Sequence, residues 1–410
     1  MNIWILNHYA ITPDMPGGTR HYDFSKELTK RGYNVTIFAS SFHYNQHKEL
    51  KLIKKEKYRI ENVDGINFVW IKTFPCQKND WRRIVNMISY AWRVYWLGRK
   101  IKRISNSIHK PDIIIGSSVH LLAVLSAHQL SRLYKSKFIM EVRDLWPQTL
   151  IDFKKFKKNN VIIKILQLLE KFLYQKANKI IVLLPLAKNY ITKLGINKEK
   201  IYWIANGVDL TKFKETESKQ QAKKENFKIT YVGGITEGDS LKIILDAAVI
   251  TQDKNSQDIK FDFVGDGPEK QNLIKYKDKL KLQNVKFYES VSKGKIPAIL
   301  NNANILIISQ QAIDLYKYGF SYNKLFDYMA SLKPILLAGN PINNLIDISK
   351  CGITVPPENP EKMAEAIIKL YNMSPEEREK MGQRGREYVE KYHSIPVLVN
   401  KLEKVIKEII

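Results

Sequence analysis

The sequence predicts an α/β protein made of two doubly wound, Rossmann-like domains, and three observations support this fold class. Short apolar segments rich in Ile and Val alternate with helix-like segments along almost the whole chain, as in a parallel sheet with crossover helices. The length of 410 residues suits two hydrophobic cores better than one. Residues 214–226 contain almost no apolar side chain, which is typical of a connection between domains.

Seven strands are expected in the first half of the chain. Their Ile- and Val-rich character suits strands that are buried on both faces. They are Ile3–His8, Asn34–Ser40, Ile66–Lys72, Ile113–Ser117, Phe138–Val142, Ile180–Leu184 and Ile201–Ile204. Helices are expected between them, for example over Thr19–Arg31 and Ile84–Arg103.

The same alternation restarts after the polar connection. Six further strands are expected at Ile229–Val232, Ile259–Val264, Val285–Tyr288, Ile305–Ile308, Ile335–Leu337 and Ile353–Val355. The helices expected there are Leu241–Ile250, Asn323–Ser331, Pro360–Tyr371 and the long stretch Pro375–Ile410. We therefore expect an N-terminal domain over residues 1–206, a C-terminal domain over 207–390 and a last helix, 391–410, that can cross back to the first domain. Two such domains would face each other across a cleft, with ligands at the carboxyl ends of the strands.

Composition narrows the setting in which the protein works. The chain has two cysteines, Cys76 and Cys351, which suits a reducing cytosol and neither a disulfide framework nor a cysteine metal site. The most apolar stretch, 113–127, is interrupted by polar residues and is too short for a membrane span of about 20 residues. No secretory signal is recognisable at the start of the sequence.

The net charge of +26 points to nucleic acid, an anionic membrane face or anionic substrates. It is equally compatible with a general preference for Lys, because Lys, Ile and Asn are abundant throughout the chain.

Two glycine-containing loops follow expected strands. Gly17 and Gly18 stand just before Thr19, which can cap the next helix so that its N–H groups face an anionic ligand. The segment Gly265-Asp266-Gly267-Pro268 follows a strand of the second half, and Pro268 fits the first turn of a helix. Either loop can also be a simple turn.

Charged residues mark two further candidate sites. Lys324 and Asp327 are three residues apart on an expected helix that begins at Asn323, so they share a face and can serve a phosphate and a ribose, or form a surface ion pair. Arg143 and Asp144 follow an apolar strand directly. Charges at this place are costly unless they line a cleft, although the two side chains can also simply pair.

Five motifs in order resemble retaining glycosyltransferases of family 4, which have the GT-B fold. The resemblance covers nearly the whole chain and is greatest to the bacterial branch that includes N-acetylfucosaminyl transferases of O-antigen and capsule assembly. The motifs are Pro16-Gly17-Gly18 with Arg31-Gly32-Tyr33-Asn34-Val35; Glu141-Val142-Arg143-Asp144-Leu145-Trp146-Pro147; Ile204-Ala205-Asn206-Gly207-Val208-Asp209 with Phe213; Val264-Gly265-Asp266-Gly267-Pro268; and Asn323-Lys324-Leu325-Phe326-Asp327-Tyr328-Met329-Ala330.

The resemblance implies roles for these residues. Gly17 and Gly18 would border the donor diphosphate and the acceptor, and Asp144, next to Arg143, would lie near the transferred sugar. The loop Gly265–Pro268 and the pair Val291–Ser292 would surround the nucleotide of a UDP-sugar donor. Asp327 matches the residue that binds ribose.

The chain departs from the wider family at three positions. Gly234 and Asp239 stand where an Arg and a Lys usually hold the diphosphate, and Gly319 replaces the first of two paired glutamates. We therefore expect Lys324 and the backbone around Gly233 and Gly234 to stabilise the leaving diphosphate without a metal.

The function expected is transfer of a sugar, an N-acetylated amino sugar or a deoxy sugar, from a UDP-sugar to a polyprenyl-diphosphate-linked or glycan acceptor, with retention and without a cofactor. No D-x-D pair of aspartates occurs, so no metal is expected. The alternatives are a sugar-nucleotide epimerase or a phosphorylase of the same fold. The alternative from a different functional class is a basic nucleic-acid-binding protein. The sequence contains no recognised nucleic-acid-binding motif, so we expect no nucleic acid to bind.

Two basic stretches predict contact with a membrane. Residues 78–110 contain nine basic residues and one acidic residue, with Trp and Tyr between them, and residues 154–179 contain eight basic residues and one acidic residue around an apolar run. Such sequences are typical of helices that lie on anionic lipid. We therefore expect a cytoplasmic protein that is peripheral on the inner face of the cytoplasmic membrane, unless the aromatic residues pack in the core and the lysines only solvate the outer faces.

Overall fold

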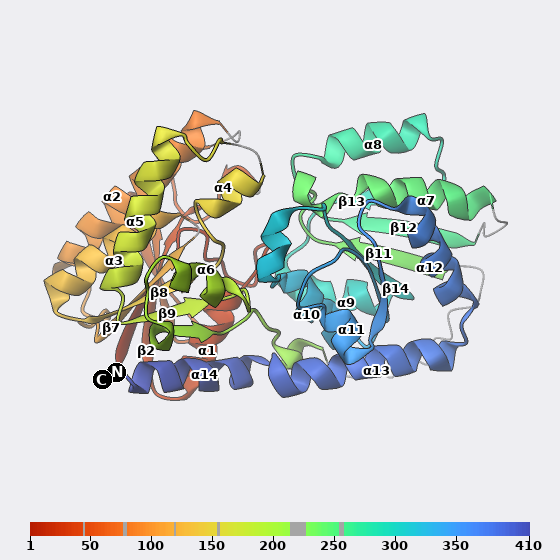
Figure 1. Ribbon diagram of the computed structural model, residues 1–410. Helices are drawn as coiled ribbons and strands as arrows, with labels where there is room; N and C mark the ends of the chain where they lie inside the picture. Colours follow the sequence, from red (N-terminus) through yellow and green to blue (C-terminus); the bar gives the residue numbers. More distant parts are fainter. Residues whose placement is uncertain (44–45, 77–79, 119, 154–155, 214–226, 254–257) are drawn as a thin grey trace. The chain divides into compact units, whose positions relative to one another are not determined.

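The computed structural model describes residues 1–410 except 44–45, 77–79, 119, 154–155, 214–226 and 254–257 (Figure 1). The chain forms two compact units. Unit 1 comprises Met1–Thr12, Gly18–Ala205 and Leu398–Ile410, and unit 2 comprises Pro13–Gly17 and Asn206–Val397. The polar connection expected at 214–226 lies outside the described residues.

Unit 1 is built on an eight-stranded sheet that is parallel except at one edge. Only β5, the edge strand, pairs antiparallel, with β6. In sheet order the strands are β10 (Ile201–Trp203), β9 (Lys179–Val182), β8 (Lys137–Val142), β7 (Ile113–Ser118), β1 (Asn2–Leu6), β2 (Asn34–Ser40), β6 (Ile66–Ile71) and β5 (Tyr58–Val63). The strand order reverses between β1 and β7, which is where such sheets bind ligands.

Helices cover both faces of this sheet. α3 packs against both α2 and α5 (Figure 1), and α14 is tied to the end of α1, where Arg31 is 2.6 Å from Glu403. The helices are α1 (Arg20–Lys30), α2 (Trp81–Ile104), α3 (Leu121–Tyr134), α4 (Gln148–Asp152), α5 (Val161–Lys176), α6 (Ala187–Lys193) and α14 (Ile395–Lys407). A short hairpin of β3 (Phe42–His43) and β4 (Lys48–Glu49) and one 3-10 turn, η1 (Lys198–Lys200), complete the described part of unit 1.

Unit 2 contains a parallel six-stranded sheet with β11 and β14 at its centre. In sheet order the strands are β13 (Val285–Tyr288), β12 (Ile259–Val264), β11 (Phe227–Val232), β14 (Ile305–Ser309), β15 (Ile335–Ala338) and β16 (Gly352–Val355). Buried aromatic residues of the central strands, among them Tyr231, Phe261 and Phe263, form one core with the helices α7 and α12. The order reverses between β11 and β14, so a ligand is expected at their carboxyl ends.

The helices α7 to α11 of unit 2 connect these strands, and α12 and α13 follow the last strand. They are α7 (Lys242–Asp253), α8 (Lys270–Lys279), α9 (Ile296–Asn301), α10 (Asn323–Ala330), α11 (Leu345–Ser349), α12 (Pro360–Asn372) and α13 (Pro375–Tyr392). Four 3-10 turns are described with them: η2 (Leu210–Lys212), η4 (Glu237–Asp239), η5 (Lys293–Lys295) and η6 (Asp314–Tyr318).

The structure confirms the α/β class with two parallel sheets, and it differs from the sequence expectation in three elements. β5 was not expected, because its half-exposed side chains give no continuous apolar run. The stretch 375–410 is two helices, since Val208 pairs with the backbone at 393–395 between them. α8 begins at Lys270, so Pro268 lies in the preceding turn and not in the first turn of the helix. Among the described residues, no helix is both long and apolar enough to cross a membrane.

Candidate functional site

In unit 2, the loops after β11 and β12 are paired backbone to backbone. The N–H of Gly233 donates to the carbonyl of Val264 at 3.0 Å, and the N–H of Ile235 donates to the carbonyl of Asp266 at 2.9 Å. The two loops therefore extend the strand pairing beyond the sheet. A phosphate would meet side chains here rather than the Gly233 amide, because that amide already has a partner.

This pairing explains both glycines of the second loop. A Cβ at Gly265 would lie 1.9 Å from the carbonyl oxygen of Gly233, and one at Gly267 would lie 2.2 Å from that of Ile235. Both residues also have positive φ angles of 157° and 159°. Glycine is therefore required for the close approach of two loops, and Pro268 follows in the same turn.

Lys324 of α10 lies over the turn at Gly233. A Cβ at Gly233 would be 3.0 Å from the Lys324 ammonium nitrogen. The ammonium is 2.5 Å from the hydroxyl of Tyr231 and 4.4 Å from the centre of its ring. The side chain crosses the carboxyl end of the first strand of the unit, which places a positive charge beside the point where the strand order reverses.

Asp239 holds the other side of Lys324. Its Oδ1 is 2.5 Å from the ammonium nitrogen, while its Oδ2 accepts from the hydroxyl of Thr236 at 2.5 Å. Burial and the charge of Asp239 keep the pKa of Tyr231 well above its ordinary value, so this phenol stays protonated and donates to the carbonyl of Gly234. The lysine is thus fixed by Tyr231 and Asp239, and an incoming phosphate would share it with Asp239.

Asp327 lies one turn along α10, on the same side of unit 2. It is buried and forms an ion pair with Lys293 of η5. Lys293 follows Ser292 and Val291, so the loop after β13 and the helix α10 meet at this pair. An ionised carboxylate accepts hydrogen bonds and donates none, so hydroxyl groups are suitable partners for it.

The first glycine loop also reaches this place. The segment Pro13–Gly17 belongs to unit 2, and the carbonyl of its buried Met15 accepts from the N–H of Lys293 at 3.2 Å. Gly17 has a φ of 135°, and the chain enters unit 1 at Gly18. The capping predicted for Thr19 is wrong, because its hydroxyl donates to Asp23 at 2.5 Å and makes no cap to the helix backbone.

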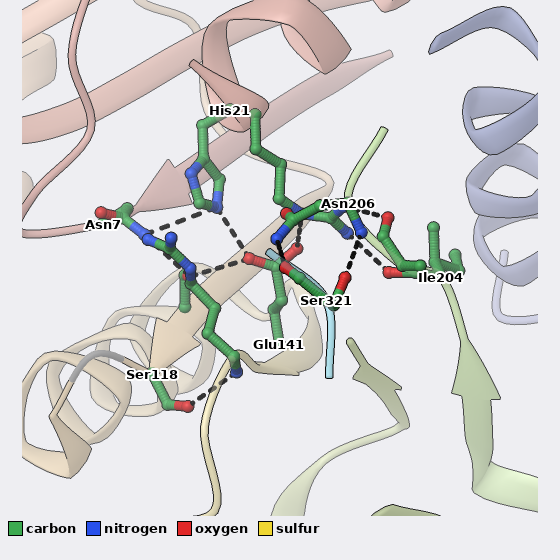
Figure 2. A network of polar contacts seen from close by, with 11 residues as sticks. Asn7, His21, Ser118, Glu141, Ile204, Asn206 and Ser321 are labelled. Carbon is green, nitrogen blue, oxygen red and sulfur yellow. Dashed lines mark hydrogen bonds and ion pairs between the residues drawn. The ribbon is translucent and has the colours of Figure 1, made fainter. Parts of the chain in front are cut away.

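Unit 1 contains a buried polar cluster at the carboxyl ends of β1, β7 and β8 (Figure 2). Glu141 accepts from Arg20 at 3.0 Å, from Ser117 at 2.8 Å and interacts with His21 at 2.7 Å. Burial by itself would raise the pKa of Glu141, but Arg20 and His21 hold it well below its usual range. Glu141 is therefore ionised and fully engaged, which makes it a structural carboxylate.

Arg20 also fixes the point where the chain leaves unit 1. Its guanidinium donates to the carbonyls of Ala205 at 2.5 Å and Ile204 at 3.0 Å. On the unit 2 side, the N–H of Asn206 donates to the hydroxyl of Ser321 at 2.8 Å (Figure 2). The motif around Asn206 thus anchors the chain in each unit separately.

Arg143 and Asp144 follow β8 in unit 1. The N–H of Arg143 donates to Ser118 at 3.3 Å, and its charge helps to lower the pKa of Glu141. Arg143 is half-buried and Asp144 is exposed. Asp144 therefore differs from Glu141: its side chain reaches the surface, yet desolvation by its surroundings raises its pKa against the lowering effect of Arg143.

A pair of buried histidines lies at the ends of β1 and β7. Nδ1 of His8 and Nε2 of His120 are 2.8 Å apart, and Nδ1 of His120 accepts from the N–H of Ala123. Burial lowers the pKa of His120 to about 3 and that of His8 well below its ordinary value. Both rings are neutral, and because Ala123 occupies Nδ1 of His120, its proton lies on Nε2 and points to His8.

Sequence reasoning missed the partners of the candidate residues. Tyr231 and Asp239 around Lys324, and Lys293 beside Asp327, are 30 or more residues away in sequence from the side chains that they contact. The signals in the sequence were weak: a Tyr at the end of a strand, and a Lys directly after the expected Val291–Ser292 pair. Within the described part of the chain, no group of three or more His, Cys, Asp or Glu side chains is arranged to hold a metal.

Two family models match the chain. "Glycosyltransferase Family 4" matches residues 17–212 and "Glycosyl transferases group 1" matches residues 212–388. The chain is 23% identical over 250 residues to "Alpha-D-kanosaminyltransferase" of Streptomyces kanamyceticus, which covers 58% of this chain and 63% of the relative. The chain therefore spans less than two thirds of the length of this curated relative.

Solved structures share the fold at low sequence identity. Sucrose-phosphate synthase of Thermosynechococcus elongatus superposes with a TM-score of 0.75 at 14% identity, covering 100% of this chain and 98% of the other. Anabaena HepE in complex with UDP-glucose superposes with a TM-score of 0.66 at 13% identity, covering both chains completely. These similarities establish the GT-B fold.

Proposed function

The chain joins a glycosyltransferase family 4 domain to a group 1 domain and is a glycosyltransferase of the GT-B type, and we propose that it transfers a sugar from a UDP-sugar to a lipid-linked or glycan acceptor with retention. The donor sugar proposed is an N-acetylated amino sugar or a deoxy sugar, as in the N-acetylfucosaminyl transferase branch of surface polysaccharide assembly that the motifs resemble. Anabaena HepE, which shares the fold, is described in complex with UDP-glucose, and this supports UDP as the nucleotide.

One observation carries the donor side of this proposal: the position of Lys324. Its ammonium group is fixed over the turn at Gly233 by Tyr231 and Asp239, at the carboxyl end of the strand where doubly wound sheets bind nucleotides. When the bond between the anomeric carbon and the diphosphate breaks, negative charge grows on the diphosphate. A preorganised ammonium group stabilises that charge without a metal.

The remaining unit 2 residues would hold the nucleoside. Asp327 would accept hydrogen bonds from the ribose hydroxyls beside its ion pair with Lys293. The loops at Gly265–Pro268 and Val291–Ser292 would flank the base, and Asn323 at the start of α10 would face the phosphates. Gly17 reaches the same loop through Met15, so it would border the diphosphate, and Gly18 the acceptor.

Asp144 and Arg143 of unit 1 would act on the sugar and the acceptor. The acceptor hydroxyl would attack the anomeric carbon on the face from which the diphosphate leaves, and its proton would pass to the departing diphosphate. No side chain would form a bond to the sugar in this mechanism. The support for Asp144 is its exposure beside a fully engaged Glu141.

We also place the enzyme in the cytoplasm, peripheral on the inner face of the cytoplasmic membrane. A polyprenyl-diphosphate-linked acceptor would be presented there, and the excess of 67 basic over 41 acidic residues favours an anionic surface.

A thermal-shift screen against nucleotide-sugars tests this function. A ligand at one hundred times its Kd stabilises the folded protein by about 2.7 kcal/mol, so a UDP-sugar should raise the melting temperature while the matching GDP- and TDP-sugars do not. Stabilisation by arbitrary DNA and by no sugar nucleotide would contradict the proposal. A transferase should release UDP when acceptor is present. An epimerase should form a new sugar nucleotide when acceptor is absent.

A further inference from the structure

The outward faces of two helices in unit 1 are apolar. On α2, the exposed residues Trp81, Ile84, Ile88, Trp92 and Trp96 follow one another at intervals of three or four. On α5, Val161, Ile165, Leu168 and Phe172 do the same, with Ile162 beside them. Such spacing places each set on one side of its helix. Trp92 is 62% exposed and Leu168 is 71% exposed, so these rows are not covered within the described chain.

The inward faces of the same helices are apolar as well. Tyr90, Val94 and Ile101 of α2 are completely buried, as are Ile163 and Leu173 of α5. A helix on the surface of a soluble domain usually has a polar outer face. Apolar residues on both faces therefore indicate that the outer rows have an apolar partner of their own.

The two rows lie on helices that cover one side of the sheet. α3 packs against both α2 and α5 (Figure 1). α2 follows β6 and α5 follows β8, so both helices begin near the carboxyl edge of the parallel sheet and run back toward the other edge. The exposed apolar rows begin at the first residue of each helix and extend to Trp96 of α2 and Phe172 of α5.

The charged residues around this surface are basic. α2 contains Arg and Lys but no Asp or Glu. Phe156, Lys157 and Lys158 are exposed just before α5. The one acidic residue of α5, Glu170, is buried and hydrogen-bonded to Tyr174 at 2.9 Å and to Tyr190 at 3.0 Å, so it does not offset the positive charge outside.

We infer that the outward rows of α2 and α5 are a membrane-docking surface, which inserts into the headgroup region of an anionic bilayer. Trp, Ile and Leu beside Lys and Arg are the combination that interfacial helices use, and an anionic lipid surface complements the charge. A second copy of this surface does not, because it would place like charges against one another. The inference rests on the proposed function in one respect only: docking would give a lipid-linked acceptor a route to the carboxyl edge of unit 1.

Vesicle sedimentation tests this surface without any acceptor. The full-length protein should pellet with vesicles of phosphatidylglycerol and phosphatidylethanolamine and stay in solution with phosphatidylcholine. The double variant Trp92→Ser/Leu168→Ser should lower the association constant with anionic vesicles at least about tenfold. The matched control is Ile342→Ser/Ile348→Ser in unit 2, which removes two residues that are 61% and 58% exposed and should leave binding unchanged.

A pair of charge variants tests which end of this surface lies closest to the lipid. Lys157→Glu/Lys158→Glu, next to the apolar end, should release the protein from anionic vesicles at low salt more than Lys100→Glu/Arg103→Glu, at the far end of α2. The opposite order would show that the beginnings of α2 and α5 are not the part of this surface closest to the lipid.

The inference would be wrong if the wild type did not bind anionic vesicles, or if the Trp92/Leu168 variant bound them as tightly as the wild type. It would also be wrong if analytical ultracentrifugation showed that the wild type self-associates and the variant does not, because the surface would then contact a second copy of the chain. Calorimetric titration with UDP keeps the two proposals apart. Normal UDP binding without vesicle binding would contradict only the docking surface. Vesicle binding without UDP binding would contradict only the proposed donor site.

Discussion

At the scale of single residues, Asp327 is the residue proposed to bind the ribose hydroxyls of UDP. Replacing it with Ala should weaken UDP binding by about 1–3 kcal/mol, because the ribose hydroxyls lose their acceptor in a desolvated site. The measurement is calorimetric titration with UDP. The control is Asp246→Ala, which removes a carboxylate paired with Lys242 at 3.2 Å on the same unit and should leave the affinity unchanged. Equal UDP affinity in a folded Asp327→Ala protein would refute the assignment.

Asp144 is expected to act on the sugar or the acceptor and not on the nucleotide. Asp144→Asn should therefore lower turnover while UDP affinity stays nearly the same. Normal turnover in this variant would make Asp144 a surface residue without a catalytic role.

The residues proposed to bind the donor could be found from motif order, but their partners could not. Lys324 and Asp327 share a helix, and their spacing of three alone puts them on one face. Their ion-pair partners, Asp239 and Lys293, come from other loops of the unit. Such contacts depend on how the strands are ordered in the sheet, which a single sequence does not encode locally.

At the scale of elements, the pairing of the loops after β11 and β12 depends on Gly265. Gly265→Ala should destabilise the protein by about 3 kcal/mol or more, because the new Cβ would lie 1.9 Å from the carbonyl oxygen of Gly233 and backbone has to move. Gly294→Ala is the control, since nothing lies within 4 Å of its Cβ position. Thermal unfolding of the two variants decides the point. Equal melting temperatures would show that the loops can separate freely.

The packing of α5 against α6 should depend on pH through Glu170. Burial raises the pKa of Glu170 to about 8, although Tyr174 and Tyr190 donate hydrogen bonds to it. A folded-state pKa above the ordinary value of 4.5 means that the folded protein holds the proton more tightly. The resulting stabilisation is complete below about pH 4.5 and is lost as the pH rises through 8.

Glu170→Gln removes this titration and keeps an acceptor for one tyrosine hydroxyl. At pH 9 the variant should be more stable than the wild type by on the order of 2–4 kcal/mol, with a much smaller difference at pH 5. Urea unfolding at both pH values measures it, and Glu199→Gln, at an exposed glutamate, is the control. A Glu170→Gln protein with the same pH dependence as the wild type would contradict the assignment.

The strands of both sheets could be predicted because buried parallel strands are continuous apolar runs. The edge strand β5 could not, since its sequence Tyr58–Val63 is polar and half-exposed. The break between α13 and α14 was also hidden. Both flanking segments have helical character, and the interruption comes from pairing with Val208, far away in sequence.

At the scale of the whole molecule, each unit has its own core and its own point of strand-order reversal, where doubly wound sheets bind ligands. The alternation of strands and helices was enough to predict two parallel sheets, and the GT-B fold is confirmed. The net charge of +26 was ambiguous in the sequence. In the structure, basic residues accompany exposed apolar rows on α2 and α5, and side-chain exposure of this kind cannot be read from composition.

Titration of the purified protein with UDP in the presence of EDTA is the most direct test of the central claim, that unit 2 binds a nucleotide diphosphate by an ammonium group and without a metal. We predict one UDP site per chain, an affinity that EDTA does not change, and an affinity that falls at least about tenfold in Lys324→Ala, since a charge-assisted hydrogen bond contributes about 1.5–3 kcal/mol. Binding that appears only after magnesium or manganese is added, or that Lys324→Ala leaves intact, would contradict the account.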